Sequence, residues 1–221
     1  MRVVVAGGHG KVARHLTRAL SARGDVPVAL IRSLDQVEDV TGDGAEAVVL
    51  DLERCNVADV TGAVSGADAV VFAAGAGPGS GAQRKDTVDR AAAALLADAA
   101  QEAGVRRYVL VSSMGVDQRP PEGTDDVFAA YLEAKAASEQ DLRGRDLDWT
   151  ILRPGRLTDD EPTDHVTLER AVGRGDVPRG DVAAVLAALL RAPASAGLTL
   201  ELVTGVVPVE AAVVAATERA D

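Results

Sequence analysis

The small residues between Gly7 and Ala13 have the types and spacing of a phosphate-binding turn. The segment MRVVVAGGHGKVARHL holds the pattern G-x-G-x-x-A, which ends at Ala13, and the overlapping pattern G-x-x-G-x-x-A. Glycine allows a turn with positive φ and lets a pyrophosphate approach the backbone, whose N–H groups face the anion where a helix begins. A Val-rich run precedes the turn and an amphipathic pattern follows it, so the motif predicts a dinucleotide site rather than an ordinary strand–helix connection. The residues expected to contact the cofactor here are Gly7, Gly8, His9, Gly10, Lys11 and Val12.

Arg32 ends the second apolar run, where proteins specific for NAD usually carry an acidic residue. A cation suits the 2′-phosphate of NADP and leaves no carboxylate to repel it. Ser33 could add a hydrogen bond to that phosphate, and Lys11 could add a positive charge. The sequence therefore favours NADP over NAD, the alternative being that Arg32 is an ordinary surface arginine.

Asp51 and Leu52 follow the third apolar run, at the corner that borders the adenine in this kind of fold. The Asp51 carboxylate is a candidate partner for the exocyclic amine of adenine and equally a candidate N-cap of the next helix.

Two loops rich in Gly, Pro and polar residues, Gly75–Gln83 and Met114–Asp125, each follow a predicted strand. Ligands of open α/β sheets bind at the carboxyl ends of strands, so we expect these loops to line the substrate site. Further cofactor contacts are expected from Ala73, Ala74 and Gly75.

Tyr131 and Lys135 lie four residues apart on a predicted helix and therefore share a face, while Ser113 follows a predicted strand. An ammonium close to a phenol lowers the pKa of the phenol, which suits a tyrosine to act as a general acid or base. A serine hydroxyl could hold the substrate oxygen, and Lys135 could also bind the nicotinamide ribose. The alternative is that Tyr131 is a half-buried packing residue and that Lys135 extends its amine to solvent.

Short apolar runs that predict buried strands alternate with longer helical patterns. The predicted strands are Val3–Val5, Val28–Ile31, Ala47–Leu50, Ala69–Ala73, Tyr108–Val111 and Trp149–Leu152. The predicted helices are Val12–Ala22, a weak turn at Leu34–Val40, Val57–Ser65, Asp86–Ala103 and Asp126–Arg143. This alternation predicts an α/β protein, a three-layer Rossmann fold with a mostly parallel, doubly wound sheet and right-handed crossovers.

After Leu152 the regular alternation of strands and helices ends, and we expect a small extension on the substrate side. We expect a turn at Arg153–Gly155, an irregular segment at Thr158–His165, a helix at Val182–Arg191 capped by Asp181, a last strand at Leu198–Val203 and a terminal helix at Val209–Arg219. No linker or repeat interrupts the chain, so residues 1–221 are expected to form one domain, with 1–152 as its core and 153–221 completing the fold.

The amino-acid composition disfavours several classes of binding partner. Acidic residues outnumber Lys and Arg by 34 to 23, a net charge of −11, which disfavours nucleic acid and anionic membranes. The single cysteine, Cys55, excludes an intrachain disulfide, and the scattered histidines predict no metal site. We find no signal-like start and no apolar run of the roughly 18 residues that span a bilayer, so we expect a cytoplasmic monomer or small homo-oligomer that acts on a small molecule.

The chain resembles atypical short-chain dehydrogenases/reductases of the NmrA-like, NAD(P)-binding and epimerase/dehydratase-like kind. The resemblance extends over nearly the whole length and rests on VAGGHGKVARHL, VALIRS, DTVDRAAAALLADAAQEAGVRRYVLVSSMG, YLEAKAASEQDLRGRDLDWTILRPGRLTDD and RGDVAAVLAALL. It implies that Pro154, Gly155 and Leu157 pass close to the nicotinamide. Asp89 is a departure, because related enzymes carry an Asn there, so the resemblance implies cofactor binding more firmly than catalysis.

The first functional hypothesis is an NADP-dependent oxidoreductase that moves a hydride to or from a small carbonyl or alcohol. Tyr131 would be the acid or base, Ser113 the substrate anchor, and Lys135 the ribose clamp. Three alternatives stay open: a non-catalytic NADP sensor, a sugar-nucleotide epimerase or dehydratase, and a flavin or biliverdin-type reductase. The short tail after Leu152 leaves little room for the substrate domain of a sugar-nucleotide enzyme.

Overall fold

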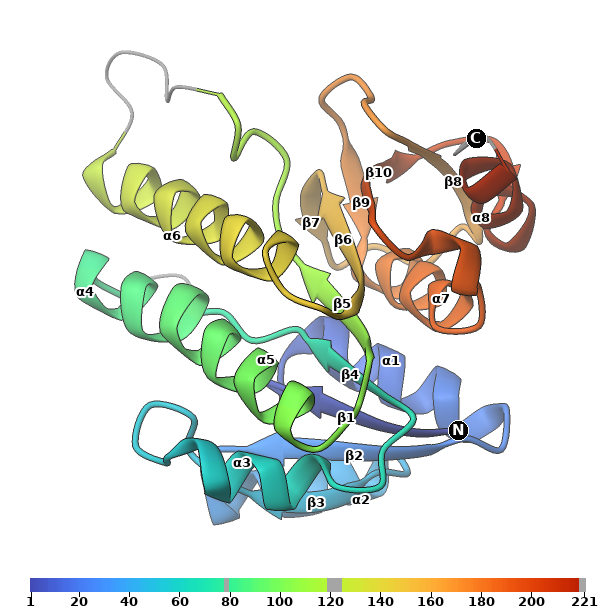
Figure 1. Ribbon diagram of the computed structural model, residues 1–221. Helices are drawn as coiled ribbons and strands as arrows, with labels where there is room; N and C mark the ends of the chain where they lie inside the picture. The colour runs from blue at the N-terminus through green and yellow to red at the C-terminus, as the bar shows by residue number, and fades with distance from the viewer. Residues whose placement is uncertain (78–79, 119–124, 219–221) are drawn as a thin grey trace.

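The computed structural model describes residues 1–77, 80–118 and 125–218, and a nine-stranded sheet runs through these residues in the order β11-β8-β10-β6-β5-β4-β1-β2-β3 (Figure 1). Its parallel strands are β1 (Arg2–Ala6), β2 (Val26–Ile31), β3 (Glu46–Val49), β4 (Ala69–Phe72), β5 (Arg107–Val111), β6 (Asp148–Pro154) and β10 (Leu198–Thr204). Two strands, β8 (His165–Glu169) and β11 (Val207–Pro208), extend the sheet in antiparallel pairing. A separate parallel pair joins β7 (Arg156–Thr158) to β9 (Asp176–Pro178).

The strand β1 lies at the centre of the sheet because its side chains are apolar on both faces. Val3, Val4 and Val5 are all fully buried, and the β-branched side chains suit the pleated surface. In the parallel register Val4 lies beside Val28 of β2 and beside Val70 of β4. The sheet order reverses at β1, so the carboxyl ends of β1 and β4 form the switch point at which doubly wound sheets bind ligands.

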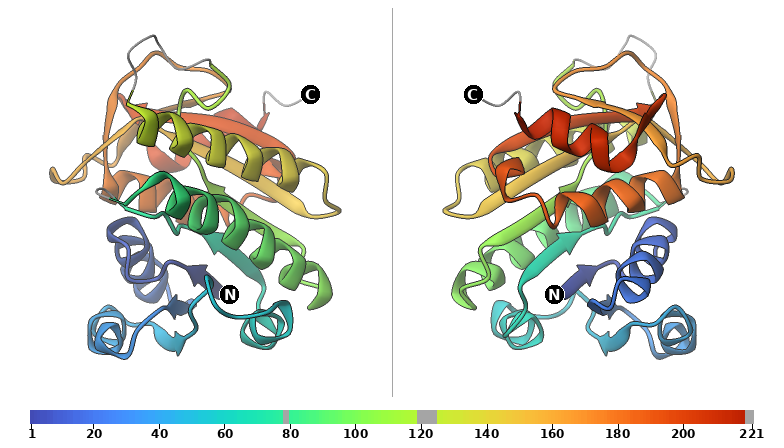
Figure 2. Two further views of the ribbon diagram at one scale, coloured as in Figure 1. Left: turned by 90° about the vertical axis from the view of Figure 1, so that its left-hand side faces the viewer. Right: turned by 90° about the vertical axis from the view of Figure 1, so that its right-hand side faces the viewer.

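Helices cover both faces of the sheet and make three layers (Figures 1 and 2). On one face lie α1 (Lys11–Ala22), α7 (Arg179–Leu189) and α8 (Val209–Glu218), whose apolar side chains pack on a core that includes Val3 and Val5. On the other face lie α3 (Val57–Val64), α5 (Ala92–Glu102) and α6 (Asp126–Arg143), packed on Val4 and Phe72. The remaining helical segments are η1 (Leu34–Gln36), α2 (Val37–Gly42), α4 (Ala82–Arg84), η2 (Lys85–Ala91) and η3 (Pro193–Ser195).

These observations confirm the predicted α/β Rossmann architecture. The helix expected over Asp86–Ala103 is divided, because η2 is a π-helix that leads into α5. Inserted π segments are frequent at functional sites, and this one carries Lys85 and Asp89. No helix in the described ranges is both long enough and apolar enough to cross a membrane.

The segment after Leu152 differs most from the sequence-based expectation. The turn predicted at Arg153–Gly155 is wrong, since β6 continues to Pro154 and pairs there with Leu202. Asp181 is not an N-cap, because α7 begins two residues earlier, after Pro178. The fully buried Asp181 carboxylate instead accepts hydrogen bonds from the backbone amides of residues 163 and 164, at 3.0 and 2.8 Å, and ties the preceding loop to the helix.

Candidate active site

A cavity of about 880 Å³ lies at the carboxyl ends of the central strands. The turn after β1, the end of β2, the segments after β3 and β4, and the N-terminal half of α6 all contribute to its wall. The sequence-predicted residues that line it are Gly7, His9, Gly10, Lys11, Val12, Arg32, Asp51, Leu52, Ala73, Ala74, Gly75, Tyr131, Lys135 and Leu157. Residues from six separate parts of the chain thus meet at one place, as the sheet topology requires.

The glycines of the first turn leave the backbone open where a phosphate would approach. Gly7 has a φ of +76°, and a Cβ atom there would lie 2.5 Å from the backbone Cα of Ala74. A Cβ on Gly8 would lie 2.5 Å from the Cβ of Ala29, so Gly8 lets the turn pack on β2 and does not itself line the cavity. The Gly10 amide donates to the Gly7 carbonyl at 2.8 Å and closes the turn.

The N-terminus of α1 faces the cavity without a side-chain cap and without an acidic residue in its first turn. Its free backbone amides and the helix dipole favour an anion there. The turn is therefore a fitting cradle for a pyrophosphate: space that a Cβ would fill is kept clear, and donors are left for the phosphate oxygens.

The polar side chains of this turn, His9 and Lys11, contact carboxylates from other parts of the chain. Nε2 of His9 lies 2.7 Å from Oδ2 of Asp39, and this hydrogen bond is the main reason that the pKa of Asp39 is below its usual value. Nζ of Lys11 is paired with Asp159, which also accepts from Arg179 at 2.7 Å. Lys11 and Arg179 thus meet a shared carboxylate at the rim of the cavity, between the first turn and the loop after β7.

Arg32 stands exposed at the end of β2 and borders the cavity. Within the described ranges its guanidinium has no carboxylate at ion-pair distance, and its backbone amide donates to Gln36 at 3.2 Å. Ser33 does not line the cavity, since its hydroxyl donates to Asp35. Of the two predicted 2′-phosphate contacts on β2, the structure therefore places Arg32 at the cavity and turns Ser33 away.

Asp51 lines the cavity, and the helix-cap alternative for it is wrong. Asn56 caps α3 through a capping box with Asp59. The Asp51 carboxylate instead accepts from the amide of Glu53 at 3.1 Å and lies 3.6 Å from Arg54. The Asp51 carboxylate therefore borders the cavity in the segment after β3.

Tyr131 and Lys135 come together in the cavity as their spacing on α6 predicts. Nζ of Lys135 lies 6.0 Å from the centroid of the Tyr131 ring and donates to the carbonyl of Val111 at 2.9 Å. It also lies 3.2 Å from Oδ1 of Asp89, and both side chains are almost completely buried. The other oxygen of Asp89 accepts from the amide of Ala76 at 3.2 Å. Asp89, the departure from the family pattern, thus supplies a counter-charge that holds the Lys135 ammonium in place.

Lys85 is a site residue that sequence reasoning missed. Its Nζ lies 5.3 Å from the centroid of the Tyr131 ring and donates to the carbonyl of Gly77 at 2.9 Å. In the sequence it stands among charged residues at the start of a predicted helix and looks like a solvated position. Its four-residue spacing from Asp89 is the one signal that could have placed it on the cavity side of that helix.

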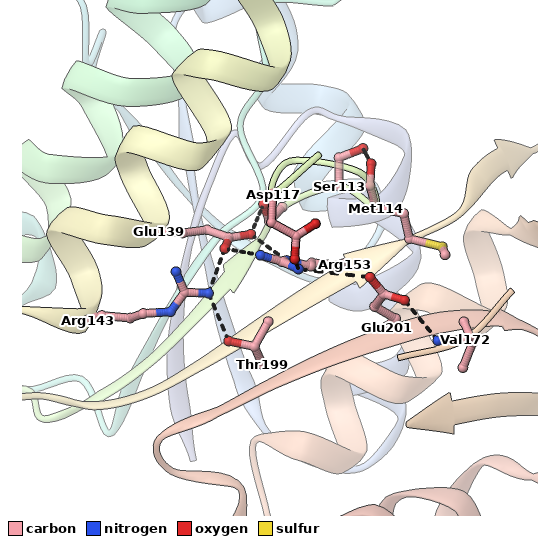
Figure 3. Close-up of polar contacts among 10 residues, drawn as sticks. Ser113, Met114, Asp117, Glu139, Arg143, Arg153, Val172, Thr199 and Glu201 are labelled. Atoms are coloured by element: carbon pink, nitrogen blue, oxygen red, sulfur yellow. Dashed lines mark hydrogen bonds and ion pairs between the residues drawn. The ribbon is translucent and has the colours of Figure 1, made fainter. Parts of the chain in front are cut away.

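Ser113 is not brought to Tyr131. Its hydroxyl donates to the carbonyl of Met114 at 3.2 Å (Figure 3). Ser113 is not part of the cavity wall. The neighbouring Ser112 does reach the wall, but its hydroxyl donates to the buried carboxylate of Glu139 at 2.5 Å. Neither serine hydroxyl is presented to a substrate oxygen beside Tyr131.

Glu139 and Arg153 anchor α6 to the sheet (Figure 3). Arg153 donates two hydrogen bonds to Glu139, at 2.9 and 2.8 Å, and a third to Asp117 at 2.8 Å. Burial would lower the pKa of Arg153, but these hydrogen bonds outweigh it and raise that pKa. Because Glu139 follows Lys135 by one helical turn and also holds Ser112, this buried pair fixes α6 at the end of β5.

The resemblance-based contacts near the nicotinamide are only partly brought to the cavity. Leu157 lines it, whereas Pro154 and Gly155 do not. A Cβ on Gly155 would lie 2.2 Å from the carbonyl oxygen of Gly175, so this glycine permits the close passage of two backbones beside β7 and β9. In the described ranges no group of three or more His, Cys, Asp or Glu is arranged to hold a metal ion.

Comparisons with known proteins agree with this geometry. A family model described as NAD(P)H-binding matches residues 7–193. The Saccharomyces cerevisiae UPF0659 protein YMR090W is 34% identical over 220 residues, which cover 95% of this chain and 96% of the yeast protein.

Two solved structures are similar over almost the whole chain. A Bacillus halodurans protein, provisionally assigned as an NAD-dependent epimerase/dehydratase, has a TM-score of 0.89 and 36% identity over 97% of this chain and 99% of its own. ChuY, an anaerobillin reductase from Escherichia coli O157:H7, has a TM-score of 0.76 and 27% identity over 92% and 97%. With its glycine turn, its cavity at the switch point and these relatives, the chain belongs to the NAD(P)H-binding family of Rossmann-fold proteins.

Proposed function

We propose that the protein is an NADP-dependent oxidoreductase that transfers a hydride to or from a small carbonyl or alcohol. The observation that carries this proposal is the presence of Tyr131 in the same cavity as the glycine turn, with the buried Lys135 ammonium 6.0 Å from its ring centroid. A protein that only senses a dinucleotide has no need for a phenol beside the buried Lys135 ammonium.

Different residues of the cavity have different roles. The amides at the start of α1 bind the pyrophosphate, and Lys135, held by Asp89 and the Val111 carbonyl, offers donors to the nicotinamide ribose. Bound NADPH supplies the hydride. In the direction of reduction the Tyr131 hydroxyl would give its proton to the substrate oxygen as the carbonyl becomes an alcohol, and Tyr131 would be left as a phenolate beside the Lys135 ammonium. We assign no role to Ser113, since its hydroxyl lies outside the cavity.

Arg32 supports NADP over NAD as the cofactor. It is exposed at the end of β2, and the acids around it are engaged with other groups. Glu53 accepts from Arg84 at 2.9 Å and from Thr87 at 2.8 Å, and its pKa is lowered chiefly by the Arg84 hydrogen bond. Arg32 is thus free to pair with a 2′-phosphate.

The provisional assignment of the Bacillus halodurans relative favours a second candidate, an epimerase or dehydratase reaction. In such a reaction the same Tyr131 would remove and return a proton, and the cofactor would end in its starting redox state. Net consumption of NADPH with a carbonyl compound therefore supports the first candidate, and conversion without net consumption supports the second.

The cofactor part of the proposal is tested by titrating the protein with NADPH and NADH and following the nicotinamide fluorescence. We expect NADPH to bind at least about tenfold more tightly, and we expect Arg32→Ala to remove most of that preference. Arg106→Ala is the control, because Arg106 is exposed and precedes β5, at the opposite end of the sheet from the cavity. Equal affinity for the two cofactors in the parent protein would contradict the assignment of NADP.

The catalytic part is tested by screening carbonyl compounds for NADPH oxidation with the Tyr131→Phe variant beside the parent. Tyr131→Phe should abolish most of the turnover and leave NADPH affinity unchanged, since only the hydroxyl is lost. Tyr108→Phe is the matched control: this second tyrosine is buried, and its hydroxyl donates to the carbonyl of Ala93 at 3.1 Å. Turnover that survives in Tyr131→Phe removes Tyr131 from the mechanism.

A further inference from the structure

Two ammonium groups flank the ring of Tyr131, and they differ in how their charge is balanced. Lys135, on α6, has the carboxylate of Asp89 at 3.2 Å. Lys85, on η2, is 8% exposed and lies 5.3 Å from the ring centroid. Among the residues that the structure describes, its hydrogen-bond acceptor is the neutral carbonyl of Gly77, and no carboxylate lies within ion-pair distance.

A buried ammonium without a counter-ion is unfavourable, because removing a charge from water carries a desolvation penalty that one carbonyl offsets only in part. An ammonium has three N–H donors, and the Gly77 carbonyl takes one of them. The Tyr131 ring adds a cation–π contact, which contributes attraction but no hydrogen-bond acceptor. Lys85 therefore keeps donors and an unbalanced charge directed at the space beside Tyr131.

The acids that line the cavity do not balance this charge. Glu53 is held by Arg84, and Asp89 is held by Lys135. Asp125 accepts from the amide of Phe128 at 3.1 Å, where it caps α6. Among the residues that the structure describes, no carboxylate pairs with the Lys85 ammonium beside Tyr131, which favours an anion in the bound ligand.

We propose that Lys85 binds an anionic oxygen group of the substrate, so that the substrate is a carbonyl compound with a carboxylate close to the carbon that is reduced. This inference rests on the proposed oxidoreductase function and adds the chemical class of the substrate. The carboxylate would pair with the Lys85 ammonium while the neighbouring carbonyl oxygen meets the Tyr131 hydroxyl. A 2-oxo acid has both groups on adjacent carbons, and the Lys85 ammonium lies 5.3 Å from the centroid of the ring that carries the hydroxyl.

The binding test uses the NADPH-loaded protein with oxamate, a non-reducible analogue of a 2-oxo acid, and with oxamide, its neutral counterpart. Isothermal titration is expected to show at least about tenfold tighter binding of oxamate than of oxamide. Lys85→Met should remove this difference, and Lys85→Arg should keep most of it. Arg90→Met is the control, because Arg90 lies on the same helical segment but forms an exposed pair with Asp86. Oxamate that binds no better than oxamide, or that binds equally to the parent and Lys85→Met, overturns the inference.

A kinetic test separates substrate binding by Lys85 from an effect of Lys85 on Tyr131. We expect Lys85→Met to raise the KM for a 2-oxo acid about tenfold or more and to leave the KM and kcat for its methyl ester within about twofold. A role through Tyr131 would instead lower kcat for acid and ester alike and would overturn the proposal. Failure of the proposed function is visible separately: the protein would then not bind NADPH or would reduce neither the acid nor the ester. If NADPH binds and the ester is reduced as well as the acid, the function stands and the Lys85 inference alone is wrong.

Discussion

Replacing Gly7 by alanine tests whether the first turn is shaped by a close approach of backbones or only by its left-handed conformation. Gly7 and Gly24 both have a φ of +76°. An added Cβ at Gly24 would meet nothing within 4 Å, whereas one at Gly7 would lie 2.5 Å from the Cα of Ala74. The two substitutions therefore share the conformational cost, and only Gly7→Ala adds a collision with the cavity wall.

The magnitudes follow from these two terms. Left-handed backbone costs an L-residue about 1–2 kcal/mol, so Gly24→Ala should lower the free energy of unfolding by roughly that amount. Gly7→Ala should lose about 1–3 kcal/mol more, because overpacking against backbone forces a shift. Since Ala74 lines the cavity, this shift should also weaken NADPH binding at least about tenfold, which is about 1.4 kcal/mol.

The assay is urea unfolding of the two variants without cofactor, followed by NADPH titration. Gly24 lies in the turn before β2, at the amino end of that strand, so Gly24→Ala should keep the parent affinity for NADPH. If the two variants are destabilised equally and Gly7→Ala binds NADPH like the parent, the close approach has no role in the cofactor site and the argument from the glycine turn is refuted.

Two further predictions concern ion pairs, the first buried and the second partly exposed. Glu139→Gln should lower the free energy of unfolding by about 1.5–3 kcal/mol, because Arg153 loses its buried charged acceptor and keeps only the carboxylates of Asp117 and Glu201. Loss of the exposed pairs in Arg106→Ala should lower it much less, and equal urea midpoints for the two variants would contradict this. Burial raises the pKa of Asp43, but hydrogen bonds from Arg14 and Arg18 outweigh burial and lower it. The stabilising effect of Asp43 is therefore complete above the unfolded value near pH 4 and is lost as the pH falls further. Asp43→Asn should flatten the decline in stability below about pH 4, and an unchanged decline would remove Asp43 from the acid sensitivity.

The elements that sequence reasoning predicted well are those with local signals. The valines of β1 and the apolar run of β5 are buried on both faces, and such runs are visible without knowledge of their partners. The glycine turn was visible for the same reason, because its spacing is local. Tyr131 and Lys135 were placed together by helical periodicity alone.

The elements that were missed depend on distant partners. The short strands β7 and β9 contain polar or charged residues and exist only because they pair with each other beside Gly155. Whether Ser112 or Ser113 faces the cavity depends on the register of the extended chain at the end of β5. A register shift of one residue would place Ser113 in the cavity wall instead of Ser112. Lys85 was missed because its burial comes from the packing of η2 on α6, and its four-residue spacing from Asp89 is the one local signal of its position.

The most direct test of the account is a crystal structure of the protein grown with NADPH. The account predicts the pyrophosphate against the amides of the Gly7–Gly10 turn, the 2′-phosphate within hydrogen-bond distance of the Arg32 guanidinium, and the nicotinamide in the cavity beside Tyr131. A dinucleotide bound elsewhere, or bound with its nicotinamide outside this cavity, would contradict the central claim that one site joins the glycine turn to the tyrosine.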